Sequence, residues 1–189
     1  MKTPILLLLI LISFTACQKV ANITPQSDTS KTKGNTVPPG DPTIKPDSIP
    51  DNSAFRLRLN KNDSDYDETL FMFRKKASLN YSSGEDAAYM VGFGDLSLAS
   101  ISNDGKKLSI NGLPYTQGMS IGLDVEAKDD GNYSLQVSYE NKMPANIQLW
   151  IKDTYLKDSV NVCTANYKFT VSKADTNSFG SKRFKLIIK

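Results

Sequence analysis

Histidine is absent from the chain, and cysteine is nearly so, with only Cys17 and Cys163. Without an imidazole the chain has no histidine general acid or base, no Ser-His or Cys-His nucleophile pair and no histidine metal ligand. Cys17 is assigned a different role below, which leaves Cys163 without a partner. We therefore expect no internal disulfide, and we expect Cys163 to be a buried structural thiol.

A strong charge of either sign is also missing. Lys and Arg together number 23 and Asp and Glu number 20, so the formal net charge is +3. Loss of Lys2 with a cleaved leader would lower this charge by one. Such a small positive balance does not indicate a nucleic-acid-binding protein.

No hydrophobic run is long enough to span a membrane as a helix, which takes roughly 20 residues. The run ILLLLILI, residues 5–12, follows a short positive start and has the length of the apolar region of a signal peptide. The segment SFTAC, residues 13–17, resembles the lipobox of bacterial lipoproteins, with Phe14 where Leu is usual. The resemblance implies a signal peptide over residues 1–16, cleavage after Ala16, and acylation of Cys17 as the membrane anchor.

The residue after Cys17 is Gln18 rather than Asp. By resemblance to the sorting rule of Gram-negative lipoproteins, Gln18 implies the outer membrane. Surface-exposed lipoproteins of Bacteroidota often carry an acidic cluster here, and residues 18–22 contain none. Both the periplasmic and the cell-surface face therefore stay open. The alternative is an ordinary secretory signal followed by a coincidental cysteine.

Residues 17–53 are poor in apolar side chains and rich in Pro, Thr, Ser, Asp and Lys. Such a segment does not bury enough surface to offset the entropy of ordering, so we predict a disordered or extended linker. As a flexible coil it would span roughly 30 Å, and as a polyproline-like chain up to about 100 Å. Its expected role is to hold the folded part away from the membrane.

Short runs of alternating apolar and polar residues fill residues 54–189, and no stretch of ten residues has a convincing helical pattern. Nine or ten strands between Gly, Asn and Asp turns predict an all-β domain, an antiparallel two-sheet β-sandwich of immunoglobulin-like or jelly-roll-like type. The expected strands are 55–59, 69–73, 108–110, 121–125, 133–139, 147–151, 155–162, 167–171 and 183–189, and the segments 88–93 and 96–101 are shorter candidates.

The segment 121–139 carries the clearest pattern, because two alternating runs flank the turn residues 128–132. The spacing Asp129-x-Gly131-x-Tyr133 matches the tyrosine corner of immunoglobulin-like sandwiches. The alternative interpretation is an ordinary hairpin with an aromatic residue in its second strand.

The order of several short motifs resembles a β-domain of secreted Bacteroidota proteins, which commonly precedes the C-terminal sorting signal of type IX secretion cargo and large adhesins. The motifs that carry the resemblance are Asp67–Thr69, Asp86–Tyr89, Lys107–Pro114, Gly131–Leu135, Leu149–Asp153, Tyr167–Thr170 and Arg183–Leu186. The resemblance implies a noncatalytic sandwich module. No sorting domain follows the last expected strand, so only the module is carried over and not type IX export.

Three alternating acids, Asp63, Asp65 and Asp67, form the densest acidic cluster and are the candidate ligands of a Ca²⁺ ion. The cluster is not an EF-hand, because Glu68 takes the place of the glycine and Arg74 that of the final glutamate. The alternative is a solvated turn with no metal.

Trp150 and Tyr155 are the candidate ligand-binding residues. Trp150 lies between Leu149 and Ile151, so it points to the opposite face from these two. We expect a membrane-anchored, noncatalytic lipoprotein whose sandwich is a structural, adhesion or protein-binding module. The alternatives are a carbohydrate-binding lipoprotein with an exposed aromatic face, and a glycan-active enzyme with paired carboxylates.

Overall fold

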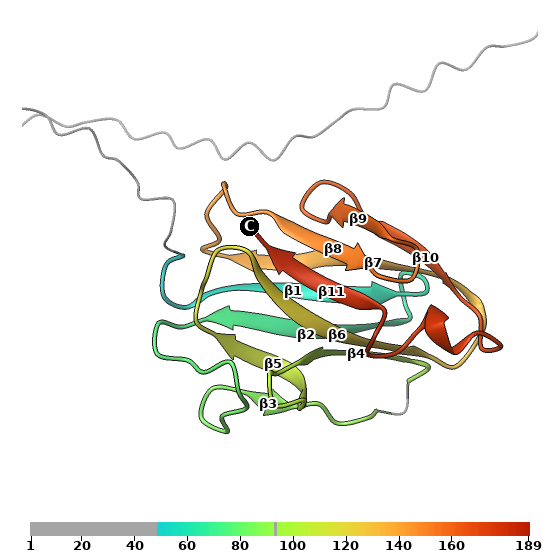
Figure 1. Cartoon of the computed structure of the whole chain (residues 1–189), viewed down its shortest axis with the longest axis horizontal. Helices are drawn as coiled ribbons and strands as arrows, with labels where there is room; N and C mark the ends of the chain where they lie inside the picture. The colour runs from blue at the N-terminus through green and yellow to red at the C-terminus, as the bar shows by residue number, and fades with distance from the viewer. Residues whose placement is uncertain (1–48, 93) are drawn as a thin grey trace, which may run out of the picture. The chain divides into compact units, whose positions relative to one another are not determined.

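The computed structural model describes residues 49–92 and 94–189. The predictions for the signal peptide over residues 1–16, for Cys17 and for the linker up to residue 48 lie outside the described residues. The described part consists of β-strands and one short 3₁₀ helix, Thr176–Ser178, which confirms the all-β prediction (Figure 1).

The described part has eleven strands. In chain order they are β1 (Ser53–Asn60), β2 (Tyr66–Phe73), β3 (Ala87–Ala88), β4 (Leu96–Ile101), β5 (Lys107–Leu113), β6 (Met119–Ala127), β7 (Gly131–Asn141), β8 (Leu149–Asp153), β9 (Asp158–Asn161), β10 (Tyr167–Val171) and β11 (Phe184–Ile188).

The strands form one sheet in the order β10-β7-β1-β2-β5-β4-β6-β11-β8-β9, and β3 pairs with β5 outside this path. Among the described strands every pairing is antiparallel except that of β2 with β5. The sheet curls until its two halves face each other, so that the rings of Phe169 in β10 and Phe184 in β11 lie 4.7 Å apart between centroids. The result is a mostly antiparallel sheet that is nearly barrel-shaped (Figure 1).

The core lies between the two halves and is built from the alternate residues that the sequence pattern placed inward. Phe55, Leu57 and Leu59 of β1 are fully buried, and Phe55 stacks on Phe71 of β2 with ring centroids 4.8 Å apart. Because successive side chains of a strand point to opposite faces, the period of two in the sequence is enough to select these residues. The core also includes Ile49, which precedes the predicted start of the sandwich at residue 54.

Three of the strand predictions are wrong in their bounds. The segment 155–162 contains only the short strand β9, Asp158–Asn161. The segment 88–93 was expected to be a strand, but β3 ends at Ala88. The expected strand 108–110 is too short, because β5 continues to Leu113 and pairs in parallel with β2. Gly112 is suited to this place because a Cβ there would lie 3.0 Å from the carbonyl oxygen of Glu85.

The segment 121–139 is not a hairpin, because its two strands do not pair with each other. Strand β6 pairs with β4 and β11, whereas β7 pairs with β1 and β10 in the other half of the sheet. The hydroxyl of Tyr133 donates a 2.9 Å hydrogen bond to the backbone carbonyl of Asp129. A tyrosine corner makes a hydrogen bond of this kind, from its hydroxyl to the backbone a few residues upstream.

Candidate ligand-binding site

The three predicted calcium ligands lie at the start of β2 and do not form a metal-binding group. Asp63 is exposed, and Asp65 lies in the turn before the strand. Asp67 accepts hydrogen bonds from the hydroxyl of Tyr89 and the backbone N–H of Leu98, each 2.8 Å long. Within residues 49–92 and 94–189, no three or more Asp, Glu or Cys side chains are grouped so that they could hold a metal ion.

Trp150 lies in β8 on the face away from the core, as its position in the sequence predicts, and it is partly buried. Its indole N–H donates a 3.0 Å hydrogen bond to the side-chain oxygen of Gln148. The ammonium group of Lys189 lies 4.6 Å from the centroid of the Trp150 ring. The ring is therefore partly covered by a lysine rather than presented as a bare platform.

Tyr155 follows β8 and is 44% exposed. Its hydroxyl donates a 2.7 Å hydrogen bond to Asp175, and its backbone N–H donates to the side chain of Asp153. The guanidinium of Arg183 lies 5.1 Å from the centroid of the tyrosine ring. The hydrogen bond to Asp175 raises the pKa of Tyr155 above its ordinary value. These contacts fix the ring in one orientation at the protein surface.

The expectation of a buried thiol is wrong, because Cys163 is exposed. Strand β9 ends at Asn161, and Cys163 lies in the turn that follows, where its backbone N–H donates to the side chain of Asn161. Val162, the preceding residue, is the one that packs into the core.

Two carboxylates that the sequence analysis did not select lie next to Tyr155. Asp124 and Glu126 share the face of β6 that points away from the core, because Leu123 and Val125, which alternate with them, are buried in it. Asp124 is nonetheless only 2% exposed, and one of its oxygens lies 2.6 Å from the ammonium group of Lys107. An acid on the outer side of a strand can be this deeply buried only if another part of the chain covers it.

Residues 175–183, which contain the 3₁₀ helix, run beside β6. The backbone N–H of Gly180 donates a 2.6 Å hydrogen bond to the carbonyl of Val125 and so attaches the segment to β6. Gly180 has a φ of 86°, a conformation that favours glycine. Asp175 caps the 3₁₀ helix by accepting a hydrogen bond from the backbone N–H of Asn177.

A buried arginine holds the other end of this segment. Arg183 forms an ion pair of 2.8 Å with Asp153, and both side chains are almost completely buried. Arg183 also donates to the carbonyl oxygens of Thr170 and Ser178, and the hydroxyl of Tyr167 donates to Asp153. Burial raises the pKa of Asp153, but hydrogen bonds, led by those from Arg183, outweigh this effect and hold the pKa below its ordinary value.

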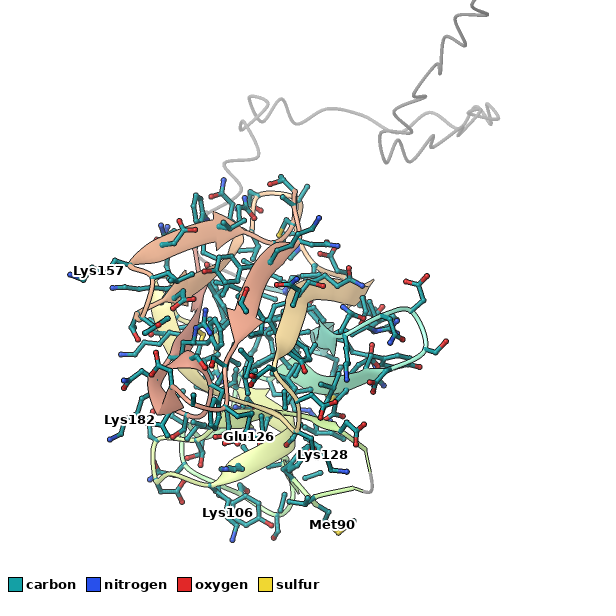
Figure 2. The ribbon with its side chains drawn as sticks, turned by 90° about the vertical axis from the view of Figure 1, so that its right-hand side faces the viewer. Met90, Lys106, Glu126, Lys128, Lys157 and Lys182 are labelled. Carbon is teal, nitrogen blue, oxygen red and sulfur yellow. The ribbon has the colours of Figure 1, made fainter. Side chains whose placement is uncertain are left out.

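Strand β6, the segment after β8 and residues 176–183 enclose a cavity of about 620 Å³, which we call the β6 cavity. Its lining residues are Lys107, Asp124, Glu126, Thr154, Tyr155, Thr176, Asn177, Phe179, Gly180, Ser181, Lys182 and Arg183. In Figure 2, the side chain of Lys182 lies at the outer edge of the molecule and Glu126 lies farther in.

Glu126 is the one carboxylate of the β6 cavity that has neither a hydrogen bond nor an ion pair with any described residue. Burial raises its pKa, and the negative charge of Asp124 raises it further; the charges of Lys173 and Lys107 offset part of this increase. The remaining acids and bases of the cavity are mostly paired with one another. The arrangement therefore offers a fixed aromatic ring, an unpaired carboxylate and several hydroxyl and amide groups to a ligand.

A second hollow, of about 560 Å³, lies beside the first half of β6. Ser120 and Gly122 contribute to it from the same outer face of β6 that carries Asp124 and Glu126. Leu79, Ile101 and Lys185 are also among its lining residues. Residues on the outer face of β6 thus line two neighbouring depressions in the protein surface.

Comparisons with protein-family models, with curated proteins and with solved structures find no match for this chain. Within residues 49–92 and 94–189, no helix is both long enough and apolar enough to cross a membrane.

Proposed function

We propose that the chain is a noncatalytic binding module of the cell envelope, anchored in the outer membrane through an acylated Cys17. The observation that carries the binding role is the shared outer face of β6, which contributes to both hollows. Binding sites are typically concave and combine apolar walls with a few convergent polar groups. The β6 cavity fits this description through Tyr155, Phe179 and Glu126.

We propose further that the curled sheet works as a two-layer sandwich of the immunoglobulin-like type. The crossing from β6 to β7 through the tyrosine corner supports this interpretation, because such corners connect the two sheets of a sandwich. The parallel pairing of β2 with β5 then marks the place where one layer continues into the other.

Site-specific crosslinking tests the binding role. A photoreactive p-benzoylphenylalanine replaces Lys182 at the rim of the β6 cavity, in cells that make the full chain. The matched control carries the same group in place of Tyr139, which is 48% exposed on β7 in the other half of the sheet. We expect adducts from position 182 and none from position 139. Equal adducts from both positions, or none from position 182, would contradict a binding surface on β6.

Carbohydrate binding is the second candidate function, and the half-exposed ring of Tyr155 at the cavity favours it. A glycan-active enzyme would instead use Asp124 and Glu126 as paired carboxylates. The ion pair with Lys107 ties up Asp124, so we propose binding without turnover. Incubation with oligosaccharides should accordingly release no new reducing ends, and a time-dependent release that Glu126→Gln abolishes would establish the enzyme instead.

A further inference from the structure

We propose that the β6 cavity binds a sugar ring of a neutral glycan, with Tyr155 as its aromatic wall and Glu126 as the acceptor of sugar hydroxyl protons. This inference rests on the proposed binding function and specifies its ligand class and its site. It places the ligand away from Trp150, whose ring is partly covered by Lys189.

The first argument is the rigidity of the aromatic wall. The hydroxyl and the backbone N–H of Tyr155 are both held by carboxylates, those of Asp175 and Asp153. The ring remains 44% exposed in spite of these contacts. A sugar ring has a face of C–H groups that can pack on an aromatic ring, and a preorganised ring loses little conformational entropy when the ligand binds.

The second argument is the unpaired carboxylate. An ionised carboxylate only accepts hydrogen bonds, so a ligand for Glu126 must bring donors. The vicinal hydroxyl groups of a sugar supply two donors at the spacing of the two carboxylate oxygens. They would replace the hydration that Glu126 loses through partial burial, the effect that raises its pKa.

The third argument is the charge balance of the β6 cavity, which favours a neutral ligand. Lys107 pairs with Asp124, and the buried Arg183 pairs with Asp153. Glu126 and Lys182 remain, and their charges are opposite. A polyanionic or polycationic ligand would therefore meet no excess of complementary charge.

Size and polar lining agree with this ligand class. A volume of about 620 Å³ lies within the range of small-molecule sites, about 300–1,000 Å³. Thr176, Asn177 and Ser181 contribute side chains that both donate and accept hydrogen bonds, as sugar hydroxyl groups do.

Calorimetric titration of the full lipidated chain in detergent micelles tests the proposal. The ligands are neutral hexaoses of glucose, mannose and xylose, compared with oligogalacturonate as the acidic and oligochitosan as the cationic class. The variants are Tyr155→Ala and Glu126→Gln. Tyr139→Ala and Glu140→Gln on β7 are the matched controls, since both side chains are exposed and lie outside the cavity.

We expect at least one neutral hexaose to bind. Tyr155→Ala should weaken its binding by about tenfold or more and Glu126→Gln by about fivefold, with both controls within about twofold of the parent chain. Unchanged melting temperatures would show that the variants are folded.

Three outcomes would overturn the proposal. If both cavity variants still bind a neutral hexaose as the parent chain does, the ligand binds elsewhere. If the parent chain prefers the acidic or the cationic oligosaccharide, the ligand is not a neutral glycan. If no neutral hexaose binds while position 182 still forms crosslinks, the glycan inference fails and the binding function stands.

Discussion

Asp153 is a fully buried carboxylate whose hydrogen bonds determine whether the segment 175–183 stays in place. It accepts from Arg183, from Tyr167 and from the backbone N–H groups of Tyr155 and Leu156. A buried ion pair is tolerated only when its remaining donors and acceptors are satisfied, and here they are. Loss of one partner would leave the other charge buried without compensation.

Arg183→Met should therefore lower the free energy of unfolding by about 3–5 kcal/mol, as measured by urea titration. The matched control is Lys61→Met, because Lys61 pairs with Asp129 while the two side chains are 31% and 59% exposed. An exposed pair contributes little to stability, because solvent screens it. Similar losses in the two variants would show that the buried pair has no special role.

Glu126 should make stability depend on pH in the opposite sense to Asp153. Its pKa is raised in the folded chain, so the favourable contribution of its protonated form is present below the ordinary pKa and is lost as pH rises through the raised value. At neutral pH the ionised carboxylate is destabilising, and Glu126→Gln removes it.

We expect Glu126→Gln to unfold at higher urea concentration than the parent chain at pH 7, with the difference shrinking to zero below about pH 4. The exposed Glu140→Gln is the matched control. A difference that is independent of pH would rule out the raised pKa as its cause.

At the scale of secondary-structure elements, the sequence predicts β6 and β7 as strands but does not predict which strands they pair with. Alternation and the Asp129-x-Gly131-x-Tyr133 spacing are local patterns, so they identified the inward residues of both strands and the Tyr133 contact. The partners of β6 and β7 come from distant parts of the chain, such as β1 and β11, and no local pattern determines them. The hairpin alternative was wrong for this reason.

Tyr133→Phe removes the hydrogen bond to Asp129 but keeps the aromatic ring in the core. We expect it to lower the free energy of unfolding by about 0.5–1.5 kcal/mol. Tyr139→Phe, six residues along the same strand and 48% exposed, should change it by less than about 0.5 kcal/mol. Equal effects would indicate that the corner hydrogen bond does not stabilise the crossing.

The candidate site was only partly predictable, because it depends on which segment covers which strand. Tyr155 was selected from the sequence, and the structure places it at the β6 cavity. Asp124 and Glu126 occupy the polar positions of an alternating strand, which normally face solvent. Two acids that are two residues apart in a strand share one face, and this spacing was the sequence signal from which the pair could have been selected. The local pattern does not show that the two acids line one hollow together with residues from 176–183.

At the scale of the whole molecule, the proposed anchor determines where the binding surface acts. Several acyl chains hold a protein stably at a membrane, whereas a single chain does so only marginally. Cys17→Ser should therefore move the chain from the membrane fraction to the soluble fraction and remove the mass of the acyl groups. The control Cys163→Ser should leave the chain in the membrane fraction, since Cys163 lies in the folded body. Retention of Cys17→Ser in the membrane would exclude lipid anchoring at this residue.

Strand β11 is the last of the eleven strands in chain order, yet it lies between β6 and β8. During synthesis, these two strands have no partner between them until residues 184–188 have been made. The body therefore does not assemble stepwise as it emerges from the ribosome, and most of its pairings join segments far apart in sequence, which makes folding slow. Under the proposed export of the chain, late closure of the sheet would keep it unfolded long enough to be threaded through a secretion channel.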